Sequence, residues 1–375
     1  MNLLFLKTLA MKTSTIILLS LYIGLTSCKK SGSSGEEQLG DAELSTKVIA
    51  SGLSHVWEMA YTADDHIWYT ERSGKISRVN IQNGEKTLLL NISDVDARGE
   101  GGLLGMVHHP QFPAQPYLYV VYNYNRSGTY SQKVVRYTFA NNSLSAPQVL
   151  LDQIPAGNIH NGSRLVISSD KLFISTGDAG NANSAQNLSA LSGKILRINL
   201  DGSIPADNPF NNSPVWSYGH RNPQGLVFAN NKLYASEHGP DKDDEINLIE
   251  KGRNYGWPNV NGFCDESGEN TFCNTNNVRE PLKSWTPTIA PSGLTYYNHS
   301  LIPQWKNSLI LAVLKGSKII MLKLDEAGNT ITNTEDYFAN EYGRKRAVCV
   351  APNGKVYFAT SNGSDDKIIE IDRSN

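Results

Sequence analysis

The sequence predicts an all-β fold: a six-bladed β-propeller with four-stranded antiparallel blades. The first observation is a repeated unit, because an apolar run, a polar turn and a branched or aromatic run recur six times along the chain. The second is that Asn-Gly and Gly-rich turn signals fall between the runs, as hairpins require. The third is that no segment shows sustained helical periodicity. A β-sandwich is the alternative, but it does not explain a sixfold repeat.

The strand-like runs follow one another in a regular order. Each repeat opens with two runs, and the six pairs are residues 56–61 with 66–70, 103–108 with 117–122, 164–167 with 171–175, 225–229 with 232–236, 293–297 with 308–313, and 347–351 with 355–359. Third runs follow at residues 75–79, 133–137, 194–199, 245–249, 318–324 and 367–371. The second runs begin roughly 50 residues apart, or about 75 across an inserted segment at residues 262–286. We therefore expect one propeller domain over residues 44–375, with its blades between residues 44 and 372.

The N-terminal segment has the features of a bacterial export signal. A basic start at Met11-Lys12 precedes an apolar run over residues 15–25, which is shorter than the ~20 residues of a membrane span. The run ends in Leu25-Thr26-Ser27-Cys28, which resembles the lipobox of bacterial lipoproteins. An ordinary signal peptide with an incidental cysteine is the alternative.

We expect a lipoprotein signal peptide over residues 1–27, a lipidated Cys28 and a flexible tether that extends to residue 43. The mature protein would be exported and anchored by its lipid to a membrane, facing the periplasm or the cell surface. Export permits disulfide bonds, and we predict one between Cys264 and Cys273, which flank a polar loop. Cys349 lies in an apolar run and is expected to be a buried free thiol.

The composition excludes several classes of function. The chain has 34 Lys and Arg against 36 Asp and Glu, a net charge of −2, so we expect no nucleic-acid partner. It contains no HExxH, CxxC pair or GxGxxG, and zinc, dithiol and nicotinamide sites therefore have no support. We expect a monomer.

Polar residues gather where the propeller places one rim. The first strand of each blade lines the central channel, so residues just before strand one and just after strand two face the same rim. Those before strand one are Glu100, His160, Arg221, Asn222, Thr288, Arg344 and Arg346. Those after strand two are Glu71, Arg72, Asp178, Glu237, His238 and Lys315.

Four cations are expected to converge on the mouth of the channel, and they are Arg221, Lys315, Arg344 and Arg346. Like charges brought together cost free energy unless an anion neutralises them. The pattern therefore predicts a pocket for a multiply anionic ligand, which Arg can bind in a bidentate manner and Lys as a point charge. The alternative is that each cation is separately solvated on its loop.

The same rim carries a candidate catalytic pair and candidate metal ligands. His160 could act as a general base with Asp178 as its orienting carboxylate, although a loop histidine is often a plain surface residue. Backbone carbonyls at Gly239-Pro240, before an acidic run, could bind Ca²⁺. That signal is weak, because acidic loops are usually just solvated. The loop at residues 261–265, with a carboxylate after turning backbone, is a second weak candidate.

These residues lie in stretches that resemble a known family, the PQQ-dependent soluble glucose dehydrogenases and aldose sugar dehydrogenases (glucose/sorbosone dehydrogenases). The resemblance covers about residues 45–372, in order. The matching stretches are GEGGLLGMVHHPQF (99–112), HNGSRLVI (160–167), STGDAG (175–180), GKILRINLDGSIPADNPF (193–210), YGHRNPQG (218–225), SEHGP (236–240), DDEINLI with NYGWP (243–258), WTPTIAPSG (285–293), LKGSKI (314–319) and GRKRAV (343–348).

The resemblance implies an oxidation of aldoses at the anomeric carbon to lactones, with hydride passing to C5 of pyrroloquinoline quinone (PQQ). It makes His160 the general base, Asp178 its orienting partner and Arg221 the group that stabilises charge near the quinone oxygens. It assigns the cofactor and its carboxylates to Arg221, Asn222, Gln224, Thr288, Lys315, Arg344 and Arg346. Carbonyls of Gly239 and Pro240 would bind the cofactor-linked Ca²⁺, and Asn261, Phe263 and Asp265 match a second, structural Ca²⁺ site.

Some residues depart from the family pattern. Ile159 precedes the base where glucose dehydrogenases carry an acidic residue, and Glu100, a candidate for the substrate pocket, replaces a glutamine. Long insertions of the glucose enzymes are short or missing, which favours the aldose branch. A cofactor-free binding module and a Ca²⁺-dependent lactonase-type hydrolase are the alternative functions. The electron acceptor of a dehydrogenase is not identified by the sequence.

Overall fold

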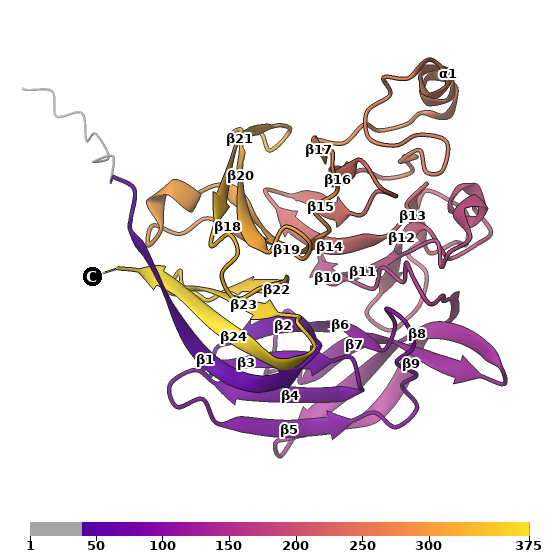
Figure 1. The fold of residues 1–375 in the computed structure, drawn as a ribbon. Coiled ribbons are helices and arrows are strands. Elements are labelled where there is room, and N and C mark those ends of the chain that lie inside the picture. Colours follow the sequence, from indigo (N-terminus) through magenta and orange to yellow (C-terminus); the bar gives the residue numbers. More distant parts are fainter. Residues whose placement is uncertain (1–39, 375) are drawn as a thin grey trace, which may run out of the picture. The chain divides into compact units, whose positions relative to one another are not determined.

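The structure is a computed structural model that describes residues 40–374; the expected signal peptide, Cys28 and most of the tether lie outside these residues. The described chain forms six four-stranded antiparallel sheets, which confirms the predicted blades (Figure 1). The first three blades comprise β2 (Val56–Thr62), β3 (His66–Glu71), β4 (Lys75–Asn80) and β5 (Lys86–Asn91); β6 (Leu103–His108), β7 (Tyr117–Arg126), β8 (Thr129–Ala140) and β9 (Ser143–Pro155); and β10 (Leu165–Ser168), β11 (Lys171–Thr176), β12 (Lys194–Asn199) and β13 (Val215–Tyr218).

The last three blades follow the same order, with one exception in the sixth. They comprise β14 (Pro223–Ala229), β15 (Lys232–Glu237), β16 (Asp244–Ile249) and β17 (Lys283–Trp285); β18 (Pro291–Tyr297), β19 (Ser308–Val313), β20 (Lys318–Leu324) and β21 (Ile331–Tyr337); and β22 (Lys345–Val350), β23 (Val356–Thr360), β24 (Ser364–Arg373) and β1 (Leu44–Ser54). Each inner strand contacts the inner strands of both neighbouring blades, in the closed cycle β2, β6, β10, β14, β18, β22 and back to β2. This closed ring is the six-bladed propeller.

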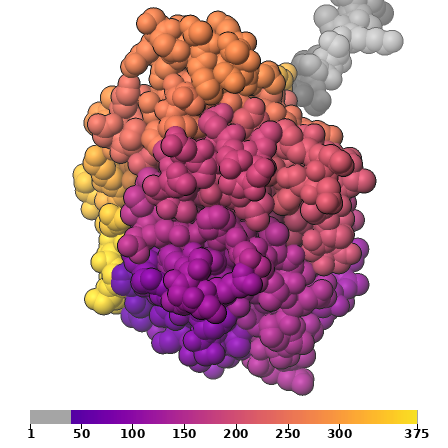
Figure 2. Space-filling model, turned by 90° about the vertical axis from the view of Figure 1, so that its right-hand side faces the viewer, coloured from indigo at the N-terminus to yellow at the C-terminus, as the bar shows by residue number. Residues whose placement is uncertain are grey.

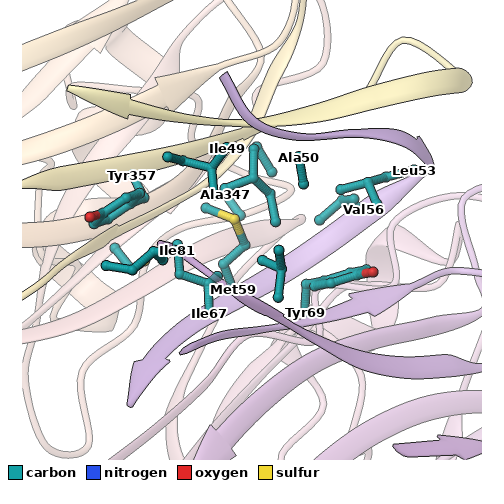
Figure 3. Packing of buried hydrophobic residues seen from close by; sticks show 14 of the residues in the cluster. Ile49, Ala50, Leu53, Val56, Met59, Ile67, Tyr69, Ile81, Ala347 and Tyr357 are labelled. Carbon is teal, nitrogen blue, oxygen red and sulfur yellow. The ribbon is translucent and has the colours of Figure 1, made fainter. Parts of the chain in front are cut away.

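The ring is closed by the first strand of the chain, which the sequence analysis did not foresee. β1 pairs antiparallel with β24, so the outermost strand of the sixth blade comes from the opposite end of the sequence. Ile49, Ala50 and Leu53 of β1 pack with Val56 of the first blade and Tyr357 of the sixth in one buried cluster (Figure 3). β1 therefore joins the first and last blades through both hydrogen bonds and apolar contacts.

A chain that begins at His55 and so lacks β1 should be far less stable than one that begins at Gly40. The deletion exposes the edge of β24 and removes two large buried side chains, which contribute about 2 kcal/mol each. Thermal unfolding monitored by circular dichroism should show a melting temperature lower by about 10 °C or more, or no cooperative transition. Equal melting temperatures for the two chains would show that β1 does not close the ring.

The inserted segment contains the α-helix α1 (Ser267–Asn276), although no segment of the sequence shows sustained helical periodicity. Its residues are almost all polar, so no amphipathic pattern marks it in the sequence. It is stabilised by a capping box between Glu266 and Glu269 and by the Cys264–Cys273 disulfide. This orange segment stands away from the sheets at the top of Figure 1 and Figure 2.

Two short 3₁₀ helices complete the regular structure, η1 (Ala182–Gln186) and η2 (Pro303–Trp305). Within residues 40–374, no helix is long and apolar enough to cross a membrane. Cys349 is buried, and burial raises the pKa of its thiol to about 12.

Candidate active site

The predicted base and its carboxylate lie together at the rim. His160 precedes β10, Asp178 follows β11, and His160 Nδ1 lies 2.8 Å from Asp178 Oδ1. The Asp178 side chain is 2% exposed, whereas that of His160 is 14% exposed and reaches the mouth. Because Asp178 accepts from Nδ1–H, His160 Nε2 is left as the free acceptor. This is the geometry of an oriented general base.

The backbone around His160 is tightly constrained. His160 has a φ of 57°, a conformation that costs a non-glycine residue free energy and that recurs at functional sites. A Cβ on Gly177 would lie 1.9 Å from the His160 carbonyl oxygen, so only glycine permits this packing. Glu100 Oε2 accepts a hydrogen bond from His160 N at 3.0 Å. Glu100 therefore contacts the backbone of the base rather than its ring.

Asp178 is held by further donors, one of which the sequence analysis did not assign. The indole Nε1 of Trp257 donates to Asp178 Oδ2 at 2.8 Å, and the backbone N–H of Gly180 donates to Oδ1 at 2.8 Å. Trp257 also lies against the guanidinium of Arg221, 5.3 Å from the ring centre. The NYGWP stretch was the only signal for Trp257, and it gave no role. The indole thus connects Asp178 to Arg221, two of the three predicted catalytic residues.

Arg221 and His238 are neighbours, as the hairpin geometry predicts. Arg221 Nη1 donates to the His238 carbonyl at 3.2 Å, while burial lowers the pKa of Arg221. His238 Nε2 donates to the Pro291 carbonyl at 2.8 Å. Burial, aided by the charges of Arg346 and Arg221, lowers the pKa of His238 to about 3, so this imidazole is neutral. The positive charge here belongs to the guanidinium alone.

Asn222, Gln224 and Arg346 come together deeper in the channel. Asn222 Oδ1 accepts from the backbone of Gly162 at 3.1 Å, and Arg346 Nη1 donates to Gln224 Oε1. Burial, together with the charges of Arg164 and Arg344, lowers the pKa of Arg346. Among the buried donors of the described chain that have no partner, three belong to predicted cofactor ligands at this mouth: Arg221 Nε, Asn222 Nδ2 and Arg346 Nε. Unpaired buried donors of this kind are what an absent acceptor ligand would satisfy.

An ion pair that the sequence analysis missed crosses the channel. Glu58 on β2 pairs with Arg164, just before β10. The Arg164 guanidinium lies 4.1 Å above the ring of Trp57, and its Nε donates to the Gln224 carbonyl at 2.8 Å. Burial raises the pKa of Glu58 against the opposing effect of Arg164. The pair fixes the strands that carry Gln224 and Trp57.

The remaining predicted cations lie on the exposed part of the rim. Lys315 Nζ donates to Thr288 Oγ1 at 3.1 Å, so these two predicted cofactor ligands are in contact. Arg344 is exposed and lies one residue before β22. Glu71 and Arg72 face elsewhere: Glu71 accepts from Ser54 N at 2.7 Å, and Arg72 donates to the carbonyls of Gly99 and Gly101. Those two residues support rim loops.

The candidate metal ligands partly converge. A cavity of about 20 Å³, large enough for one water molecule, is lined by Gly239 and Pro240 of the first predicted set and by Asn261 of the second, together with Glu237 and Glu245. Asn261 Oδ1 is buried with no partner in the described chain. Burial and the neighbouring charge of Glu237 raise the pKa of Glu245 to about 8.

The rest of the second predicted set does not reach this cavity. Phe263 and Asp265 are absent from its lining, and the side chain of Phe263 is exposed. Instead, the Phe263 carbonyl accepts from Asp265 N at 2.9 Å. No cluster of three His, Cys, Asp or Glu side chains in the part of the chain that the structure describes could hold a metal ion. A cation here would therefore depend largely on backbone and amide oxygens.

Comparisons with known proteins agree on one family. The family model for glucose/sorbosone dehydrogenase matches residues 53–370. The chain is 34% identical to quinoprotein glucose dehydrogenase B of Acinetobacter calcoaceticus, over 84% of this chain and 85% of that protein. It is 32% identical to aldose sugar dehydrogenase YliI of Escherichia coli, over 87% and 92% of the two chains.

Solved structures show the same likeness. The PQQ-bound aldose sugar dehydrogenase of Streptomyces coelicolor superposes with a TM-score of 0.77 at 33% identity, covering 89% of this chain and 99% of that one. The apo-form of the soluble aldose sugar dehydrogenase of Escherichia coli superposes with a TM-score of 0.80 at 29% identity, covering 88% and 100%. The chain belongs to the glucose/sorbosone dehydrogenase family.

Proposed function

We propose that the protein is a PQQ- and Ca²⁺-dependent dehydrogenase that oxidises aldoses at the anomeric carbon to lactones. The observation that carries the proposal is the His160–Asp178 pair beside a mouth lined with arginines. The family and the PQQ-bound relative support the same activity. PQQ, when bound, supplies the quinone that accepts the hydride from the sugar.

The residues present fit such a cofactor. PQQ is a planar quinone with three carboxylates, and the mouth offers the unpaired donors of Arg221, Asn222 and Arg346. Lys315 and Arg344 add two cations on the exposed side of the rim. Carboxylates satisfy guanidinium and ammonium donors well. These five residues, with Gln224 and Thr288, would therefore hold the cofactor.

Side chains of this protein can accept the proton that the sugar loses during oxidation. His160 Nε2 accepts the proton of the anomeric hydroxyl, because Nδ1 already donates to Asp178. Asp178 then stabilises the imidazolium that forms, as the third member of a triad does. The Arg221 guanidinium, held against Trp257, stabilises negative charge that develops beside it.

Ca²⁺ would bind near Gly239 and Pro240. The small cavity there combines these residues with the unpaired oxygen of Asn261 and with Glu245, a set of hard oxygen ligands that suits Ca²⁺. The ion would supply a Lewis acid at the edge of the site.

We further propose that the protein is exported and anchored through a lipid on Cys28, acts as a monomer and passes electrons to an acceptor that is not yet identified. The lipobox-like residues 25–28 support the anchor. Metabolic labelling with a fatty acid would test it: label should enter the native protein and be absent from a Cys28→Ala variant.

Dye-linked oxidation of a panel of aldoses tests the proposed reaction. The chain over residues 29–375, depleted with a chelator, should reduce the dye only after both PQQ and Ca²⁺ are added. Acid release without dye reduction would instead indicate a lactonase. If no sugar gives either signal and the protein retains no PQQ, the proposed dehydrogenase activity is contradicted.

Trp257→Phe should lower kcat by about 10-fold while leaving the affinity for PQQ within about threefold. Phenylalanine keeps an aromatic ring beside Arg221 and removes only the indole N–H that orients Asp178. Steady-state kinetics measure kcat, and a PQQ titration measures the affinity. Trp216→Phe, in β13, is the matched control and should change neither value. An unchanged kcat in Trp257→Phe would show that the indole N–H does not contribute to catalysis.

A further inference from the structure

Lys345 lies between two of the predicted cofactor ligands, Arg344 and Arg346, but its side chain points in a different direction. Arg346 reaches Gln224 in the channel. The Lys345 side chain is 0% exposed and enters the interior beside the fifth blade. Neighbouring residues of a strand point to opposite faces of the sheet, which explains the difference. Lys345 is thus a buried cation next to the site, yet outside it.

The Lys345 ammonium is held by a cage of backbone oxygens. Its Nζ donates to the carbonyls of Ser317 at 2.9 Å, Phe338 at 3.0 Å, Glu341 at 2.6 Å and Gly343 at 3.2 Å. Within the described residues it forms no ion pair with a carboxylate. An ammonium has three N–H donors and no acceptor, so the four carbonyls share these three donors.

The carbonyls come from the two loops that present the cofactor ligands on this side of the rim. Ser317 belongs to the turn that carries Lys315. The other three belong to the segment at residues 338–343, which leads directly into Arg344. The two loops share one direct backbone bond, from Asn340 N to Ser317 O at 3.0 Å. Lys345 adds donors to both sides of that junction.

The second loop needs such a partner. Phe338, Asn340 and Tyr342 have φ values of 53°, 64° and 58°, and Gly343 has 72°. Left-handed conformations cost non-glycine residues free energy and persist only where the surroundings impose them. This backbone turns its carbonyls inward, where they repel one another unless a cation lies among them. The ammonium supplies that cation.

We propose that Lys345 is a positioning residue for the cofactor: its ammonium joins the loop of Lys315 to the loop of Arg344 and sets the spacing of these cations for a multiply anionic ligand. The inference rests on the proposed PQQ dependence. Lys345 does not touch the ligand, so its loss should weaken binding and leave the chemistry of the loaded protein almost unchanged.

A second caged lysine provides a matched control. Lys194 on β12 is also 0% exposed, and its Nζ donates to the carbonyls of Ser184, Ala185 and Ser192 at 2.7–3.0 Å. Burial lowers the pKa of both amines, to about 7 for Lys194 and about 8 for Lys345. All three carbonyls belong to the one loop between β11 and β12, which carries Asp178 but none of the predicted cofactor cations. Loss of either lysine should therefore destabilise the fold similarly.

The test is an equilibrium titration of PQQ into the apo forms of wild type, Lys345→Met and Lys194→Met, with melting temperatures measured in parallel. We expect both variants to melt at lower temperature, and only Lys345→Met to lose PQQ affinity, by at least about 10-fold. The kcat of Lys345→Met at saturating PQQ should stay within about threefold of wild type. If Lys345→Met does not fold, the same criteria apply to Lys345→Gln, which keeps two N–H donors.

The outcomes distinguish a failure of the proposed PQQ dependence from a failure of the proposed role of Lys345. No PQQ binding by wild type would contradict the proposed function itself. Wild-type affinity in the Lys345 variant, or an equal loss of affinity in the Lys194 variant, would overturn the positioning role while leaving the dehydrogenase intact.

Discussion

His160→Ala should lower kcat by at least about 10²-fold, the usual effect of losing a general base. The variant removes the imidazole nitrogen that Asp178 leaves free to accept a proton, while Asp178 keeps its bonds to Trp257 and Gly180. PQQ affinity should remain within about threefold, because the proposed cofactor ligands are unchanged. Steady-state dye reduction and a PQQ titration measure these values.

His109→Ala is the matched control for this prediction. His109 lies between β6 and β7, at the edge of its blade opposite to the rim, and its Nδ1 accepts from Gln111 N. It should retain full activity. A loss of kcat in His160→Ala that is matched by an equal loss of PQQ affinity would mean that His160 holds the cofactor rather than moves a proton.

Arg346→Met should raise the Kd for PQQ by at least about 10²-fold, since a lost charge-assisted contact in a partly buried site costs about 3 kcal/mol. The same variant should stabilise the apo protein by about 1 kcal/mol, because replacing a buried charge with an apolar group of similar length is often stabilising. The opposing effects follow from one observation: burial and two neighbouring cations, Arg164 and Arg344, lower the pKa of Arg346.

Melting temperatures and PQQ titrations of Arg346→Met and Arg373→Met test this prediction. Arg373 is exposed at the end of β24 and should affect neither value. A destabilised apo Arg346→Met that still binds PQQ tightly would show that Arg346 supports the fold instead of the ligand.

The propeller was predictable because its signal is local and repeated. Each blade is a set of adjacent strands joined by short turns, so one apolar pattern identified six blades. The position of β1 was not predictable in the same way, because its partner β24 lies at the other end of the chain. Nothing in residues 44–54 distinguishes an outer strand of the last blade from one of the first. α1 was missed because a polar helix held by a disulfide has no hydrophobic periodicity.

The candidate site was predictable from topology, because the rim of a propeller brings His160 to Asp178 and Arg221 to His238. Topology could not identify residues that lie outside these two rim positions of each blade. Trp257 comes from a loop after β16 that the blade pattern does not position, and Glu58 faces Arg164 across the channel. Lys345 appeared as one of three adjacent basic residues. Only the structure shows that its side chain points away from its neighbours.

A single-turnover experiment tests the central claim most directly. Protein loaded with PQQ and Ca²⁺ is mixed with excess aldose in the absence of any dye, while cofactor absorbance and lactone are followed together. We predict that one equivalent of lactone forms for each PQQ reduced, and that His160→Ala slows both signals by the same factor. Lactone formed without cofactor reduction, or cofactor reduction unaffected by His160→Ala, would contradict the assignment of this mouth as the site of sugar oxidation.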